Sequence, residues 1–129
     1  LGRYTDQTPF DFMARMGIWF ENFGLPAVVN ECLLQSYNGT LRFFPNWPLG
    51  CRAEFRTLRA AGAFLVSALA EAGEVRRIEI VSEAGRPLRL ISPWPVTAVR
   101  RGSGASERLT GAELELATTP GETLRLTAG

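Results

Sequence analysis

The chain has 129 residues, of which 46% are hydrophobic and 21% charged, and its formal net charge is +1. This composition predicts one ordinary domain with a hydrophobic core and argues against intrinsic disorder. The near-neutral charge, without a run of like charges, argues against binding to nucleic acid or to an anionic membrane surface. No apolar run approaches the roughly 18 residues of a membrane-spanning helix.

All 14 basic residues are arginine, and the chain contains no histidine. Without histidine no Ser-His or Cys-His dyad can form, and zinc lacks its usual nitrogen ligand, so we expect neither a metal site nor a cofactor. The two cysteines are Cys32 and Cys51. Cys32 lies on the apolar face of a predicted helix, which favours a buried thiol over a disulfide. Because the chain opens on Leu1, we expect a processed product or a fragment.

The first predicted helix begins at Thr8-Pro9-Phe10-Asp11. Thr8 suits the N-cap, Pro9 suits the first helical position, and Asp11 can complete a capping box. The residues that follow, 10–20, are apolar on nearly every side of the helix. Because a helix without a polar face must be buried on several sides, this pattern predicts neighbouring elements that lie outside the chain.

A second helix is predicted from Leu25 to Asn38-Gly39. Its apolar residues recur at helical spacing and predict a single buried stripe. The stripe consists of Leu25, Val28, Val29, Cys32 and Leu33. Asn38-Gly39 is expected to end the helix, because glycine accepts the left-handed conformation that a C-terminal cap requires.

From Thr40 onward the apolar pattern has a period of two, which is typical of strands. The runs concerned are 41–44, 64–68, 77–80, 88–92, 96–101, 112–117 and 123–127. Turn residues separate these runs, and two Glu-Ala-Gly triplets, at 71–73 and 83–85, are interpreted as similar hairpin turns. The less regular segment 45–63, which contains Pro45, Pro48 and Gly50, is predicted to be a loop that crosses between the two parts.

These patterns predict an α+β fold, in which two N-terminal helices are followed by an antiparallel β-sandwich of about seven or eight strands. The predicted organisation is terminal helices over 1–39, a linker or crossing segment over 40–63, and the sandwich over 64–129. The adjacent arginines at 76–77 and at 100–101 fall on predicted strands. Each pair is therefore expected to divide between the two faces of a sheet rather than form a basic patch.

Four motifs follow one another between residues 18 and 70. They are Asn22-Phe-Gly24, Leu33-Leu-Gln-Ser-Tyr-Asn-Gly39, Leu41-Arg-Phe-Phe-Pro-Asn-Trp-Pro48 and Thr57-Leu-Arg-Ala-Ala-Gly-Ala-Phe64. Their order and spacing resemble the C-terminal region of the family-95 glycoside hydrolases, the α-L-fucosidase group. There the matching elements read approximately Asn-Phe-Gly, Leu-Leu-Gln-Ser-His-Asn-Gly, Leu-Leu-Pro-Ala-Leu-Pro and Leu-Arg-Ala-Arg-Gly-Gly-Phe.

The resemblance implies that the two helices close a catalytic (α/α) barrel lying mostly upstream of Leu1, and that the sandwich caps and stabilises this barrel. The longer parent would then be an inverting, secreted or periplasmic hydrolase. Phe20 occupies the position of the family's catalytic aspartate, and the neighbouring Glu21 is the candidate catalytic carboxylate. Asn22 is a candidate substrate-binding residue at the rim of the sugar site. The chain alone cannot assemble the two carboxyl groups that inverting hydrolysis requires.

Two other functions remain open. A free-standing carbohydrate-binding module would use Trp47, between Pro45 and Pro48, and Trp94, between two further prolines, to stack on the rings of an oligosaccharide. A structural interaction domain would bind no ligand. The apolar helix over 10–20 favours the barrel hypothesis, because a soluble module has no need of such a helix.

Overall fold

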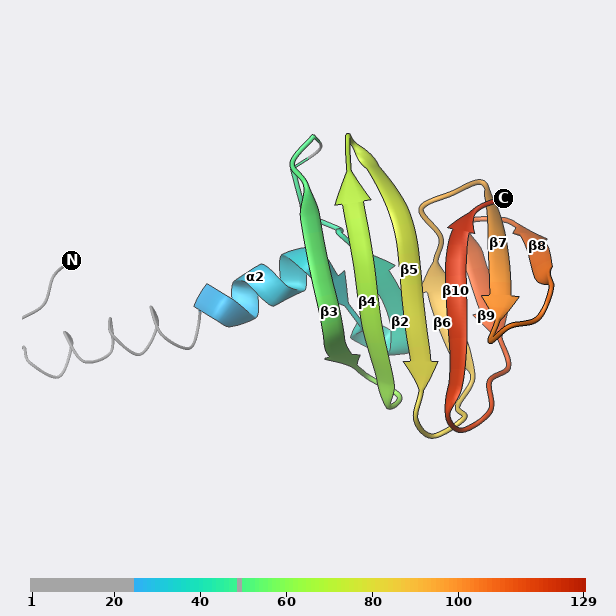
Figure 1. Cartoon of the computed structure of the whole chain (residues 1–129). Helices are drawn as coiled ribbons and strands as arrows, with labels where there is room; N and C mark the ends of the chain where they lie inside the picture. Colours follow the sequence, from blue (N-terminus) through green and yellow to red (C-terminus); the bar gives the residue numbers. More distant parts are fainter. Residues whose placement is uncertain (1–24, 49) are drawn as a thin grey trace, which may run out of the picture. The chain divides into compact units, whose positions relative to one another are not determined.

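The computed structural model describes residues 25–48 and 50–129. These residues form a mostly β structure with one short α-helix, α2 (Leu25–Leu33), and a 3-10 turn, η2 (Tyr37–Gly39) (Figure 1). The predicted α+β class is therefore wrong, because the described chain is sandwich-like and two N-terminal helices are not seen in it. The helix predicted over 10–20 lies outside the described residues. Contacts divide the chain into two compact units, Leu1–Glu31 and Cys32–Gly129, and all the described strands belong to the second.

The second predicted helix ends five residues early, at Leu33. The next two residues form β1 (Leu34–Gln35), in which Leu34 pairs with Phe43 and is 7% exposed. Burial of Leu34 between the sheets, together with the strand pairing, outweighs the local tendency to continue the helix. Asn38 does adopt the expected left-handed conformation, with φ 54°, but it belongs to the connection between β1 and β2 rather than to a helix cap.

The strands form two sheets. The smaller sheet has the order β1-β2-β6-β9 and contains β2 (Thr40–Phe43), β6 (Leu88–Ile91) and β9 (Glu113–Leu116). The larger sheet has the order β3-β4-β5-β10-β7-β8 and contains β3 (Ala53–Ala60), β4 (Phe64–Glu71), β5 (Glu74–Ser82), β10 (Glu122–Ala128), β7 (Val96–Arg101) and β8 (Ser106–Thr110). All described strand pairs are antiparallel except β2 with β6. In Figure 1 the smaller sheet lies behind the larger one.

Besides β1, two strands were not predicted from the sequence. The loop predicted over 45–63 contains β3, whose alternation is interrupted by a bulge between Phe55 and Leu58, with Thr57 at φ 56°. A bulge inserts a residue and shifts the pattern of two by one position, which hides the strand from a periodicity search. The other missed strand, β8, is an exposed edge strand with little apolar character.

The two Glu-Ala-Gly triplets differ in structure. The first makes the tight hairpin between β4 and β5, with Ala72 at φ 53° and Gly73 at φ 80°, as a two-residue hairpin turn requires. The second lies in the connection from β5 to β6, which leaves the larger sheet and enters the smaller one. The interpretation as two similar hairpins is therefore wrong for the triplet at 83–85.

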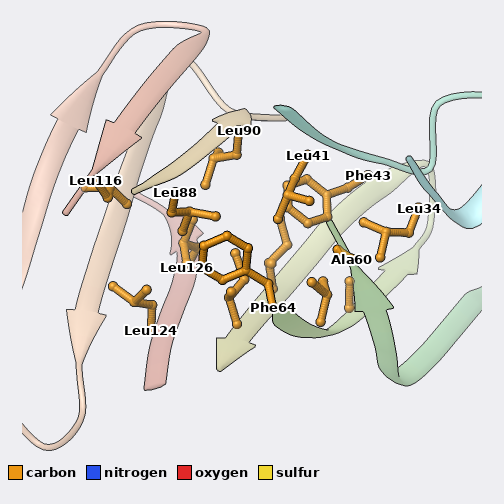
Figure 2. Close-up of a cluster of buried hydrophobic side chains, with 14 of the residues drawn as sticks. Leu34, Leu41, Phe43, Ala60, Phe64, Leu88, Leu90, Leu116, Leu124 and Leu126 are labelled. Atoms are coloured by element: carbon orange, nitrogen blue, oxygen red, sulfur yellow. The ribbon is translucent and has the colours of Figure 1, made fainter. Parts of the chain in front are cut away.

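The hydrophobic core lies between the two sheets. Figure 2 shows Leu41, Leu88 and Leu90 of the smaller sheet gathered with Phe64, Leu124 and Leu126 of the larger one. Each of these side chains is at most 3% exposed. Burying a large apolar side chain contributes about 1.5–3 kcal/mol, so this layer is the main source of stability in the sandwich.

The few buried polar side chains are all hydrogen-bonded. Ser92 and Thr97 share a hydroxyl–hydroxyl bond, and the Ser82 hydroxyl lies 2.8 Å from that of Thr118. Within residues 25–48 and 50–129, no buried side-chain nitrogen or oxygen lacks a partner. The interior of the described sandwich therefore holds no unsatisfied polar group that would point to a ligand.

Candidate functional site

Trp47, the predicted substrate-binding residue that the structure describes, lies beside a small hollow between the β2–β3 loop and the β4–β5 hairpin. The hollow has a volume of about 100 Å³, and Phe43, Phe44 and Val75 line it together with the indole. The loop is fixed by its own hydrogen bonds, since the Trp47 amide donates to the Phe44 carbonyl at 3.3 Å. Phe44 in turn packs on Phe55, with ring centroids 5.4 Å apart.

The geometry around Trp47 favours packing over recognition of a sugar. Pockets that enclose a small ligand usually measure about 300–1,000 Å³, well above the volume of this hollow. The indole Nε1 already donates to the Cys51 carbonyl at 3.2 Å, so it is engaged within the loop. Trp47 is half-buried, so part of its surface stays accessible to a sugar or to another part of a larger protein.

Trp94, the second candidate stacking residue, is used inside the fold. Its indole Nε1 donates to the Val75 carbonyl at 3.0 Å, its amide donates to the Ser92 hydroxyl at 3.1 Å, and its ring packs against the core. Two hydrogen bonds and packing against the core therefore engage Trp94 within the sandwich. The structure therefore gives Trp94 a structural role.

A group of charged residues surrounds Glu54 on the outer face of the larger sheet. Arg52, Arg56 and Arg77 lie within 3.0–3.2 Å of its carboxylate. The hydrogen bond from Arg56, together with the charge of Arg56 and the contacts of Arg52, holds the pKa of Glu54 below its usual 4.5. A carboxylate that stays ionised in this way cannot act as a general acid at neutral pH. Glu54 is therefore an organiser of the surface ion pairs rather than a catalytic residue.

Glu122 and Arg101 tie two turns to the end of the larger sheet. The Arg101 guanidinium donates to the Glu122 carboxylate and to the Ala117 carbonyl, each at 2.9 Å, and the Thr119 amide donates to Glu122 at 3.0 Å. The Arg101 hydrogen bond, followed by that of the Thr119 amide, lowers the pKa of Glu122 below its usual 4.5. A lowered pKa means that ionised Glu122 stabilises the fold above pH 4.5 and loses this effect as the pH falls through the folded-state pKa.

We therefore expect Glu122→Gln to lower the free energy of unfolding by about 1 kcal/mol at neutral pH, with the difference from the parent chain vanishing in acid. Urea unfolding of the parent chain and the variant across a pH series measures this difference in the free energy of unfolding at each pH. Glu107→Gln is the matched control, because Glu107 is exposed and has no ion pair within the described part of the chain. A difference for Glu122→Gln that stays constant into strong acid would contradict this account.

The predicted catalytic position lies outside the described residues. This holds for Phe20, for the candidate carboxylate Glu21 and for the candidate substrate-binding Asn22, so all three stay predictions. Among the residues that are described, no group of three or more metal-ligating side chains comes together. Cys32 and Cys51 are free thiols, and Cys32 is half-buried rather than buried as predicted. No helix within the described ranges is long and apolar enough to span a membrane.

The outer face of the larger sheet carries a cluster of arginines that was not predicted from the sequence. As expected, Arg100 and Arg101 divide between the two faces, because Arg101 binds the turns at the sheet end while Arg100 is exposed. However, strand pairing places Arg100 directly opposite Arg125 on the neighbouring strand β10. Residues 25 positions apart in sequence thus form a patch that only the strand order reveals.

Comparison with known proteins adds no relative. No family model matches the chain, and no curated protein matches its sequence. The resemblance to the family-95 glycoside hydrolases therefore depends on the four motifs between residues 18 and 70.

Proposed function

We propose that this chain is the C-terminal accessory region of a carbohydrate-active glycoside hydrolase that resembles the α-L-fucosidases of family 95. Its sandwich stabilises the catalytic barrel and supplies no catalytic pair of its own. The observation that carries the proposal is the direct passage of α2 into the sandwich. Leu33 is the last residue of the helix and Leu34 is the first residue of β1.

The last two residues of α2, Cys32 and Leu33, belong to the sandwich unit. The boundary between the two compact units falls inside the helix, after Glu31. Leu33 packs against the core, and its carbonyl accepts a hydrogen bond from the Phe44 amide at 2.7 Å. Independent binding modules are usually joined through flexible polar linkers, where few contacts cross. A helix that enters the sandwich without a linker supports an integral region of a larger protein over a free-standing module.

The predicted apolar stripe of α2 supports the same conclusion. Val29, which belongs to this stripe, is 42% exposed, and Cys32 and Leu33 are only half-buried. An amphipathic helix normally buries its apolar stripe against another element. Further helices of an upstream barrel would provide that element.

The first test is the mass of the native gene product in its source cell, compared with the 14.2 kDa of this chain. We expect a product several times heavier that hydrolyses an aryl glycoside, whereas the 129-residue chain alone does not. A native product of about 14.2 kDa would overturn the proposal and favour the carbohydrate-binding module. Turnover by the isolated 129-residue chain would contradict the accessory role.

A variant of Val29 tests the contact itself. In the 129-residue chain, Val29→Asp is expected to change the free energy of unfolding by less than about 0.5 kcal/mol, because the side chain is exposed. In the longer native protein the same change would bury an unpaired charge and cost at least about 2 kcal/mol. Asn30→Asp, on the exposed side of the same helix, is the matched control. Equal tolerance of Val29→Asp in both chains would exclude burial of the stripe by the upstream region.

A further inference from the structure

Three arginines from three adjacent strands gather on the outer face of the larger sheet. Arg125 on β10 lies directly opposite Arg100 on β7, and Arg108 on β8 lies opposite Ala98, one diagonal step from Arg100. All three face outward, because strand alternation turns their neighbours Leu124, Leu126 and Val99 into the core, where each is at most 1% exposed. We call Arg100, Arg108 and Arg125 the arginine face.

The sandwich neutralises only part of the arginine face. Arg125 is paired with Glu79 at 2.9 Å, and Arg100 donates from Nε to the Gly104 carbonyl at 3.1 Å. Within residues 25–48 and 50–129, no carboxylate lies within 4.0 Å of Arg100 or Arg108. Like charges directly opposite each other on neighbouring strands destabilise a sheet. Glu79 offsets this repulsion at Arg125, so the charges that remain open to an anionic partner are those of Arg100 and Arg108.

The surroundings of the arginine face fit a polymer of acidic sugars. Guanidinium groups bind carboxylates through two parallel hydrogen bonds. Hydroxyl groups lie on the same face, since Ser106 is opposite Arg100 and Thr127 is opposite Ala98, and these can bond sugar hydroxyls. Neighbouring strands are about 4.8 Å apart, a spacing similar to the length of one sugar ring.

Single-stranded nucleic acid fits this face less well. Proteins that bind it combine basic residues with aromatic side chains on which the bases stack. The described strands β7, β8 and β10 contain no aromatic residue.

We propose that the arginine face binds an acidic polysaccharide whose sugar units carry carboxylates. The surface belongs to β7, β8 and β10 and includes no residue of α2, on which the accessory role depends, so the inference goes beyond that role and does not depend on it. The ligand recognised is an extended chain of uronate units, held by its charges and its hydroxyl groups.

Affinity electrophoresis of the full chain in gels containing polygalacturonate tests this inference. We expect retardation that weakens as salt is added and that disappears when the polymer carboxylates are methyl-esterified. The double variant R100Q/R108Q should bind about tenfold more weakly, because it removes two exposed charge contacts. R86Q/R89Q removes two arginines that the sequence places on or beside β6 of the other sheet, and it should change binding less than about twofold.

R108Q alone separates loss of binding from loss of structure, because the Arg108 side chain makes no hydrogen bond within the described residues. It should keep the parent unfolding midpoint and still bind several-fold more weakly. Absence of retardation, an equal loss in R86Q/R89Q, or tighter binding of polyglutamate or duplex DNA than of polygalacturonate would each overturn the proposal.

Discussion

Replacing Leu126 with alanine is expected to lower the free energy of unfolding of the sandwich by about 3 kcal/mol. Leu126 is fully buried on β10, which pairs with β5 on one side and with β7 on the other. Its direct neighbours across the two strand pairs, Ile78 and Val99, are each 1% exposed. With paired strands on both sides, the backbone cannot move in to fill the cavity, so most of the lost packing remains uncompensated.

A loss of this size corresponds to a drop of about 10–20 °C in the unfolding midpoint of a domain of roughly 100 residues. Thermal unfolding followed by circular dichroism measures it. Thr127→Ala provides the control, because Thr127 is the next residue on the same strand and is exposed on the opposite face. Its cost should stay within about 0.5 kcal/mol. If Thr127→Ala cost as much as Leu126→Ala, the inward assignment of Leu126 would be wrong.

The inward position of Leu126 could be predicted from the sequence, but its central place in the sheet could not. Alternation over residues 123–127 is a local signal, and it correctly indicates a strand with one buried face. That β10 inserts between β5 and β7 depends on pairing with residues that lie far away in the sequence, such as Ser82 of β5 with Glu122 and Arg101 of β7 with Leu124. The same limit hid the arginine face, because Arg100 and Arg125 become neighbours only through strand order.

Local patterns misled the prediction where tertiary burial opposed them. The second helix was predicted to continue to Asn38-Gly39, yet Leu34 enters the core as a strand residue and the helix ends at Leu33. The bulge in β3 had the opposite effect, because it disguised a real strand as a loop. For the candidate site, the sequence identified Trp47 by residue type. Only the structure shows that its indole nitrogen is already bonded to the Cys51 carbonyl.

Gly85→Ala is expected to be the most damaging of the small surface changes, at about 3 kcal/mol or more. Gly85 has φ +67°, and a Cβ atom placed on it would lie 2.5 Å from Pro120 Cδ and 2.8 Å from the Pro120 backbone nitrogen. The alanine variant would thus combine a strained backbone conformation with a steric clash against a rigid ring.

The clash cannot be relieved by a simple shift of either turn, because both are bonded to Ser82. The Gly85 amide donates to the Ser82 hydroxyl at 3.0 Å, and the Gly121 amide donates to the Ser82 carbonyl at 2.7 Å. Ser82 itself is fully buried. Moving the turns apart would break these bonds and expose a polar group that is now satisfied, which adds to the cost.

Gly73→Ala isolates the steric part of this effect. Gly73 belongs to the other Glu-Ala-Gly triplet and has a similar φ of +80°, but no atom lies within 4 Å of the position that its Cβ would occupy. Its replacement should therefore cost only the backbone strain, about 1 kcal/mol. Urea unfolding of the two variants gives the difference directly. A difference of about 2 kcal/mol would mean that the β5–β6 connection packs on the Pro120 turn in solution, whereas equal costs would exclude that contact.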